Sequence, residues 1–115
     1  MIETIVLEYL NQALDVPAYM ERPERPPEQY VLLERTSGSQ RNKICSATLA
    51  MQSIAPTLYQ AARLNEIVKA AMEQATILPT ISRAKLNTDY NFTDTTTREY
   101  RYQAVYDLTY YREEE

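Results

Sequence analysis

The alternation of residue types from Arg98 to Tyr111 constrains the fold more than any other feature of the chain. Every second residue is tyrosine, alanine or leucine, and these are Tyr100, Tyr102, Ala104, Tyr106, Leu108 and Tyr110. Successive side chains of a strand point to opposite faces, so the segment predicts a long strand with one apolar and one more polar face. Such a strand is not stable alone. It therefore predicts partner strands and a layer of other elements on the tyrosine face.

Two apolar stripes predict the helices of that layer. From residue 2 to 14 the apolar residues recur at helical spacing, and Pro17 predicts the end of the helix. Thr57 and Gln60 form a capping box that predicts the start of a second helix, which runs to about Ala75. The predicted buried stripe of this helix is Leu58, Ala61, Leu64, Val68, Ala71 and Ala75, widened by Ile67 and Met72.

A first hairpin is predicted between the two helices. Residues 29–36 and 44–54 read as strands, and a short edge strand is predicted at 16–20. The run between the two longer strands has the composition of a turn, in which Gly38 would supply a positive φ. The residues of this predicted turn are Ser37, Gly38, Ser39, Gln40, Arg41 and Asn42.

A second hairpin is predicted to end the sheet. One face of residues 83–92 is expected to carry Ala84, Leu86, Thr88, Tyr90 and Phe92. The polar turn at 93–97 leads into the final strand, whose end, residues 110–115, is expected to fray. The chain is thus predicted to be one α+β domain, residues 1–115, with a mainly antiparallel β-sheet of four to five strands and two α-helices packed on one face.

Composition narrows the possible chemistry. The 115 residues include no histidine, one glycine and one cysteine, and the net charge is −4. These values argue against histidine-dependent triads, histidine-ligated metals, glycine-rich phosphate loops, disulfides and a nucleic-acid binder driven by phosphate contacts. No segment has the roughly 18 apolar residues of a membrane span, and Glu3 and Glu8 argue against a signal peptide. We therefore expect a cytosolic protein whose catalytic candidates are limited to carboxylates, lysine and tyrosine.

Several residues have both a structural and a functional interpretation. Cys45 falls on an apolar strand face and is expected to be a small core residue rather than a reactive thiol. The proline-rich stretch from Glu21 to Glu28 is expected to be a semi-rigid link rather than a ligand for a proline-binding groove. The ten tyrosines suit either a tyrosine-rich core or a protein interface. A stacking platform for single-stranded nucleic acid is disfavoured by the acidic residues around the tyrosines.

One catalytic hypothesis remains from the residues. Asp89 and Asp107 are placed on the more polar faces of two strands expected to pair, with Lys85 near them in sequence. Two carboxylates on neighbouring strands suit a magnesium ion or acid–base chemistry. Polar sheet faces also carry such residues for solubility, so the solvating role is preferred.

The stretch from Pro26 to Gly38, PPEQYVLLERTSG, is similar to a segment of tail terminator proteins of long-tailed bacteriophages, in which a proline-led strand ends in an Arg-Thr-Gly turn. The similarity continues through residues 53–57, through the alanines and leucines that follow, such as Ala61, Ala62 and Leu64, and through the last aromatic strand. It covers about residues 5 to 111. Ser39 stands where the family has the second glycine of the turn.

The resemblance implies a virion assembly protein without catalytic activity, cofactor or metal. Subunits of that family form a ring, typically a hexamer, on the head-proximal end of the tail tube. The ring stops tube polymerisation and offers the surface that joins the tail to the capsid connector. The implied partners are further copies of the chain, the phage tail tube protein and the head–tail connector protein, without nucleic-acid specificity or membrane contact. The implied location is the tail or neck of a phage or prophage virion that assembles in the host cytoplasm.

The resemblance places loops at the ring faces, here Ser37, Gly38, Ser39, Gln40, Arg41 and Asn42, and also Thr93, Asp94 and Thr95. Tyr110 and Tyr111 join this predicted interface because adjacent strand residues point to opposite faces, so one of them meets solvent or a partner. The alternatives are another neck protein, such as a head–tail joining or head-completion factor, a small carboxylate-dependent enzyme or nuclease, and an unrelated cytosolic adaptor.

Overall fold

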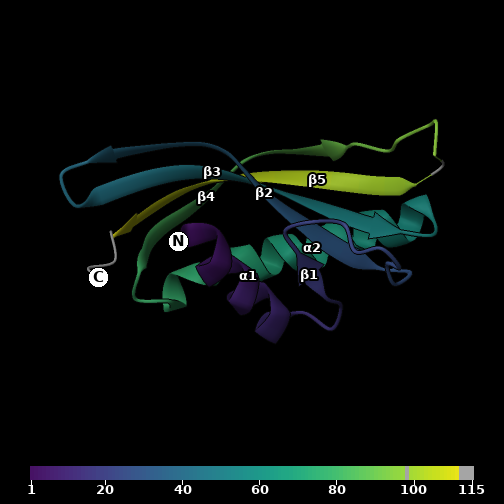
Figure 1. Cartoon of the computed structure of the whole chain (residues 1–115), viewed down its shortest axis with the longest axis horizontal. Coiled ribbons are helices and arrows are strands. Elements are labelled where there is room, and N and C mark those ends of the chain that lie inside the picture. The colour runs from purple at the N-terminus through teal and green to yellow at the C-terminus, as the bar shows by residue number, and fades with distance from the viewer. Residues whose placement is uncertain (98, 112–115) are drawn as a thin grey trace.

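The computed structural model describes residues 1–97 and 99–111. The helices are α1 (Ile2–Ala13) and α2 (Leu58–Glu73), followed by the 3-10 helix η1 (Ala75–Ile77). The strands are β1 (Ala18–Tyr19), β2 (Tyr30–Arg41), β3 (Ile44–Ala55), β4 (Ile81–Asn91) and β5 (Tyr100–Tyr111). These elements form an α+β domain in which α1 and α2 lie against one face of a five-stranded sheet (Figure 1).

The sheet has the order β1-β2-β3-β5-β4. Strand β1 is parallel to β2, and the other three pairs are antiparallel. The long strand predicted from the tyrosine alternation is β5, which lies between β3 and β4. Its residues Ala104, Tyr106 and Leu108 are buried toward the helices, as the alternation predicts.

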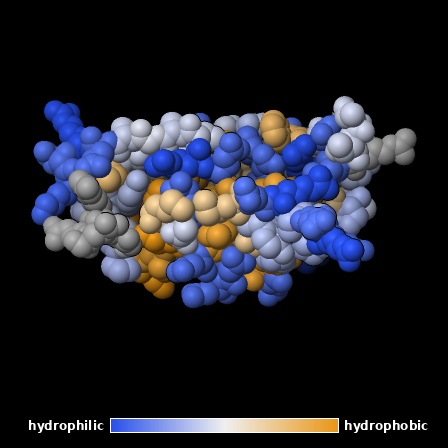
Figure 2. Space-filling model, in the orientation of Figure 1, coloured by the Kyte–Doolittle hydropathy of each residue, from blue (hydrophilic) through white to orange (hydrophobic). Residues whose placement is uncertain are grey.

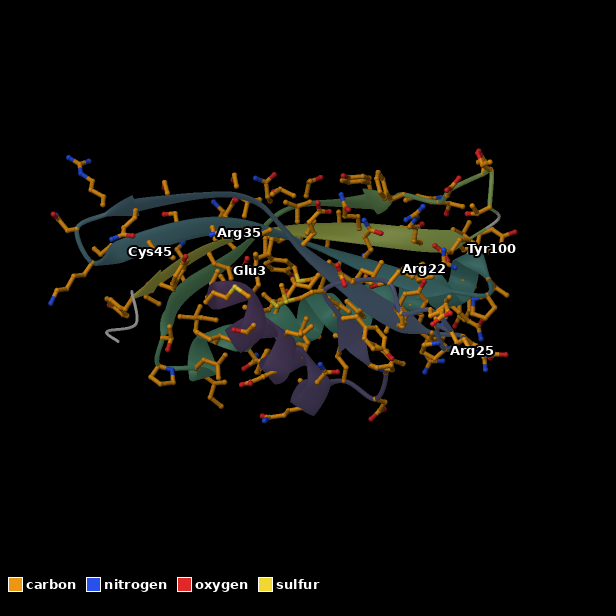
Figure 3. The ribbon with its side chains drawn as sticks, in the orientation of Figure 1. Glu3, Arg22, Arg25, Arg35, Cys45 and Tyr100 are labelled. Carbon is orange, nitrogen blue, oxygen red and sulfur yellow. The ribbon has the colours of Figure 1, made fainter. Side chains whose placement is uncertain are left out.

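Helix α1 buries Ile2, Val6 and Leu10, which share one helix face because they are four residues apart. Its first turn carries Glu3, whose carboxylate lies 3.5 Å from the Nε atom of Arg35 on β2 (Figure 3). This ion pair ties the start of α1 to the middle of β2, and a negative charge suits a helix N-terminus.

Helix α2 begins at the predicted capping residue, because the Thr57 hydroxyl accepts a hydrogen bond from the Gln60 backbone N–H. The stripe prediction is correct for Ala61, Leu64, Val68, Met72 and Ala75, all buried. It is wrong for Leu58 and Ile67, which are exposed. It also missed Asn65, which is buried against the sheet side of the helix.

The predicted turn at residues 37–42 is wrong. Strand β2 continues to Arg41, so Ser37 to Arg41 pair with β3, and only Asn42 and Lys43 form the turn. Asn42 has φ 59°, and asparagine tolerates this left-handed region better than most residues. Gly38 lies within the strand beyond a bulge between Arg35 and Ser37, without a positive φ. It leaves room for the Arg35 side chain, whose Nη1 atom would lie 3.3 Å from an added Cβ.

The predicted faces of β4 are also wrong, although the strand exists. Bulges between Ile81 and Arg83 and between Leu86 and Thr88 shift its register against β5. A bulge inserts an extra residue, so side chains beyond it change faces. Ala84 and Leu86 therefore share the helix side with their partners on β5, whereas Tyr90 lies on the opposite side with Gln103.

The end of the described chain is ordered further than predicted. Tyr110 and Tyr111 belong to β5 and pair with Cys45 and Ile44, so they are not part of a frayed tail. The remaining residues of the predicted tail, 112–115, lie outside the described residues. The edge strand predicted at 16–20 is confirmed as β1, and Cys45 is buried on the apolar face of β3, as predicted.

Candidate functional site

The sheet face opposite α1 and α2, named here the open face, is not covered by any described helix (Figure 1). Cross-strand partners share a face, which places Glu34, Ser37, Ser39, Arg41, Ile44, Ser46, Thr48, Gln52, Tyr90, Arg101, Gln103, Val105, Asp107, Thr109 and Tyr111 on it. In Figure 2 its edge at the top of the molecule is mostly white to blue, and orange gathers below it over the helices. The surface is therefore mainly polar with a few aromatic groups.

An amide and aromatic network crosses the open face where β5 begins. Gln52 donates through Nε2 to Gln103 Oε1 at 3.2 Å, and Gln103 donates in turn to the Tyr90 hydroxyl at 2.5 Å. Arg101 donates to Gln52 Oε1 at 3.1 Å, and its guanidinium carbon lies 5.5 Å from the centre of the Phe92 ring. The network fixes these side chains across three strands.

The turn before β5 is part of the same corner. Asp94 accepts a backbone hydrogen bond from Thr96 at 2.9 Å, and its other oxygen lies 3.3 Å from Nη2 of Arg101. That backbone hydrogen bond is the main reason that the pKa of Asp94 lies below its ordinary value, and Arg101 acts in the same direction. Thr93 donates to the Asn91 side chain at 2.6 Å. The predicted partner residues Thr93, Asp94 and Thr95 therefore form a structured turn.

The proline-rich stretch is also attached to this end of the sheet. Arg22 and Glu99 form an ion pair at 3.0 Å, and the Tyr30 hydroxyl donates to the same carboxylate oxygen at 3.3 Å. The Tyr19 ring meets the Tyr30 ring edge-on, with centres 6.2 Å apart. These contacts bury Tyr30 and support the structural interpretation of residues 21–28 as a link across the surface.

The two carboxylates of the catalytic hypothesis lie on opposite faces of the sheet. Asp107 is on the open face, where it accepts hydrogen bonds from Thr48 and Asn87, each at 2.9 Å. Asp89 faces α2 and accepts from Lys69 Nζ at 3.1 Å. The strands pair as predicted, but the bulge after Leu86 turns Asp89 away from Asp107. The arrangement does not suit a shared magnesium ion, and the described residues contain no group of three or more potential metal ligands.

The tyrosines divide between core and surface. Tyr9 donates to the Ala71 carbonyl at 2.6 Å and Tyr106 to the Lys69 carbonyl at 3.3 Å, so two hydroxyls hold the backbone of α2. Burial raises the pKa of Tyr106 to about 12 and also raises the pKa of Tyr9. Tyr59 and Tyr111 are exposed. Both interpretations of the tyrosine content therefore apply, each to different residues.

The hairpin end of the open face carries the other predicted partner residues. All residues from Ser37 to Asn42 are exposed, and Tyr111 lies beside Ile44 as its partner on β3. A shallow trough of about 290 Å³ crosses β2, β3 and β5 next to the hairpin tip, and it is lined mainly by serine and threonine. Tyr110 points to the other side, where it is partly buried against the core. The hairpin and the turn at 93–95 are at opposite ends of β5, so the structure does not bring these two groups together.

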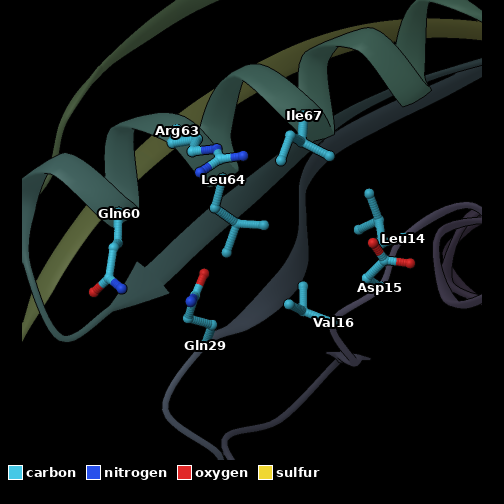
Figure 4. Close-up of a pocket in the computed structure, with 8 residues that line it drawn as sticks. All are labelled: Leu14, Asp15, Val16, Gln29, Gln60, Arg63, Leu64 and Ile67. Atoms are coloured by element: carbon cyan, nitrogen blue, oxygen red, sulfur yellow. The ribbon is translucent and has the colours of Figure 1, made fainter.

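A pocket that the sequence did not predict lies between the end of α1 and the first half of α2 (Figure 4). Its volume is about 240 Å³, and it is lined by Leu14, Asp15, Val16, Gln29, Gln60, Arg63, Leu64 and Ile67. Its lining combines leucine, valine and isoleucine side chains with charged and amide side chains. The exposed Ile67, at a position predicted to be buried, belongs to this pocket.

Comparison of the chain with protein-family models gives no match, and comparison with curated proteins gives none either. In the part of the chain that the structure describes, no helix is long and apolar enough to cross a bilayer.

Proposed function

We propose that the chain is a structural assembly protein that closes into a homo-oligomeric ring, a hexamer as in the family it resembles. The ring caps the head-proximal end of a phage tail tube, stops polymerisation of the tube and offers the surface that joins the tail to the head. The observation that carries the proposal is the open face with its long hairpin, a broad, mainly polar surface that no described helix covers. On this proposal the protein belongs to the tail or neck of the virion.

The chemistry of the surface supports a binding role. The polar groups of the open face hydrogen-bond to one another, as in the Gln52–Gln103–Tyr90 chain and around Asp107. Networks of this kind fix a surface in one shape and so favour recognition of a matching surface. Asp89 and Asp107, the two carboxylates of the catalytic hypothesis, lie on opposite faces of the sheet.

The shape and exposed groups of the molecule also suit assembly. The domain measures 44 × 23 × 23 Å, and its two ends carry different exposed apolar groups. Contacts between two different surfaces are head-to-tail, and such contacts close into a ring when the rotation between subunits permits it. The order of helices and hairpins agrees with the arrangement implied by the resemblance to tail terminators.

Deletion of the gene from the phage that encodes this chain tests the proposal. Tails without the cap are expected to exceed their normal length and to fail to join heads, as seen by electron microscopy. A plasmid copy of the gene is expected to restore both properties. Tails of normal length that join heads would exclude the proposal.

The same experiment separates the second candidate, a head–tail joining or head-completion protein. Such a protein acts after the tube is complete, so its deletion leaves tails at normal length that do not join heads. The open face fits that role as well, because it offers a surface to a partner of either kind.

A further inference from the structure

We propose that the tip of the β2–β3 hairpin of one copy inserts Ile44 into the pocket between α1 and α2 of the next copy. This head-to-tail contact deepens the proposed function and rests on it, because it supplies the subunit contact of the ring. The occupant of the pocket is therefore a second copy of the chain.

The hairpin tip presents an apolar group that the described part of the same chain leaves uncovered. Ile44 is 53% exposed and its cross-strand partner Tyr111 is 54% exposed, so together they form one apolar knob. This knob lies where β2 ends, β3 begins and β5 ends. When a partner removes exposed apolar side chains from water, their burial stabilises the complex.

The pocket offers a matching cavity. Leu14, Val16, Leu64 and Ile67 provide apolar wall, and Ile67 is 46% exposed, so its side chain also gains burial from an occupant. A cavity of about 150 Å³ lined by apolar groups is enough to hold benzene. The observed volume of about 240 Å³ therefore accommodates one isoleucine side chain with part of a neighbouring ring.

The positions of knob and pocket favour a heterologous contact. Gln29 in the pocket immediately precedes β2, and Ile44 follows the other end of that strand after the turn (Figure 1). Twelve residues of strand separate them by roughly 35 Å. Each copy therefore has the knob at one end and the pocket at the other, and repeated contacts continue from copy to copy until they close.

The charges of Arg41 and Asp15 suit the same orientation. Arg41 lies at the hairpin tip, and Asp15 lines the pocket. Arg63, which also lines the pocket, opposes this attraction in part. Opposite charges around an apolar contact guide the orientation of the encounter.

Disulfide trapping tests the contact with the full chain. In a Cys45→Ala background, which removes the native thiol, the double variant Ile44→Cys/Ile67→Cys is oxidised at high protein concentration. A head-to-tail contact is expected to give a ladder of covalent dimers, trimers and larger oligomers on a non-reducing gel. The two positions are partly exposed in the monomer, so the substitutions leave the core in place.

The matched control replaces Ile67→Cys with Ile77→Cys. Ile77 is 77% exposed, lies beyond the other end of α2, and does not line the pocket. This pair is expected to lose the ladder. Equal ladders from both pairs, or none from the first, would overturn the contact, and a product that stops at dimers would overturn the head-to-tail arrangement.

The outcome is separable from that of the gene deletion. Overlong tails after deletion, together with no ladder, would leave the cap function standing and reject this interface. A ladder specific to Ile67→Cys, together with normal tails after deletion, would support the contact and reject the cap function.

Discussion

Leu64 lies between α2 and the sheet with 3% of its surface exposed, and it also forms part of the pocket wall. Leu64→Ala is expected to lower the free energy of unfolding by about 2 to 5 kcal/mol, through lost burial and the cavity left behind. Leu58→Ala on the same helix is the control, because Leu58 is 41% exposed and its truncation is expected to cost only about 0.5 kcal/mol. Urea unfolding measures both. Equal losses would show that Leu64 is not held in the core as described.

The raised pKa of Tyr106 predicts how the stability of the fold changes at alkaline pH. Burial raises the pKa of its hydroxyl to about 12 from 10.0, so the folded state retains a proton that the unfolded chain releases. The contribution of the protonated Tyr106 to the free energy of unfolding is fully present below pH 10, and it is lost as pH rises through about 12. Tyr106→Phe removes this titration and also the hydrogen bond to the Lys69 carbonyl.

We therefore expect the variant to be less stable at pH 8 and to lose less stability than the parent between pH 10 and 12. Tyr59→Phe serves as the control, since Tyr59 is exposed and its loss should leave the parent profile unchanged. Parallel profiles for parent and Tyr106→Phe would contradict the assigned role of burial.

Among the elements, the β2–β3 hairpin depends on a single backbone conformation. Asn42 has φ 59°, a region that costs a residue with a Cβ atom about 1 kcal/mol or more. Asn42→Ala is expected to destabilise the hairpin by about 1 kcal/mol, and Asn42→Gly to cost little because glycine adopts this φ freely. Amide hydrogen exchange near Ile44 measures the effect locally. The hypothesis fails if alanine and glycine behave alike.

The helices and strands were largely predictable from sequence because their signals are periodic. The apolar stripe of α1, the cap at Thr57 and the tyrosine alternation of β5 each depend on spacing that burial then enforces. The hairpin turn was misplaced because Gly38 has the composition signal of a turn, whereas Asn42 supplies the required φ. Local composition does not reveal which residue adopts that conformation.

The surfaces were less predictable than the elements. A single bulge after Leu86 reverses the faces of β4, and nothing in the alternation around it marks the extra residue. The pocket brings Asp15, Gln29 and Ile67 together from three separate segments, so no local pattern indicates it. Of the predicted partner residues, those of the hairpin and Tyr111 share one end of the open face, and those at 93–95 lie at the other.

At the scale of the whole molecule, Asp89 and Asp107 lie on opposite faces of the sheet. We therefore expect the function of the protein not to depend on these two carboxylates. On the proposed cap function, the double variant Asp89→Asn/Asp107→Asn is expected to support tails of normal length that join heads. Loss of the Lys69–Asp89 ion pair is expected to cost at most about 1 kcal/mol. Electron microscopy of complemented phage gives the result, with urea unfolding as the control for folding. A folded double variant that failed in assembly and had lost magnesium binding present in the parent would favour the enzymatic alternative.

The central position of β5 has a consequence for the order of folding. It is the last of the described strands along the chain, yet it lies between β3 and β4, so each of those strands has an unpaired edge until β5 is in place. Ile44 pairs with Tyr111, and Ala55 pairs with Tyr100. The pairings between β3 and β5 therefore join residues that are distant along the chain. Distant pairings slow folding, because loop entropy is lost before the contacts form. During synthesis on the ribosome, α1, the first hairpin and α2 therefore emerge as an incomplete layer, and the domain closes only after translation of β5.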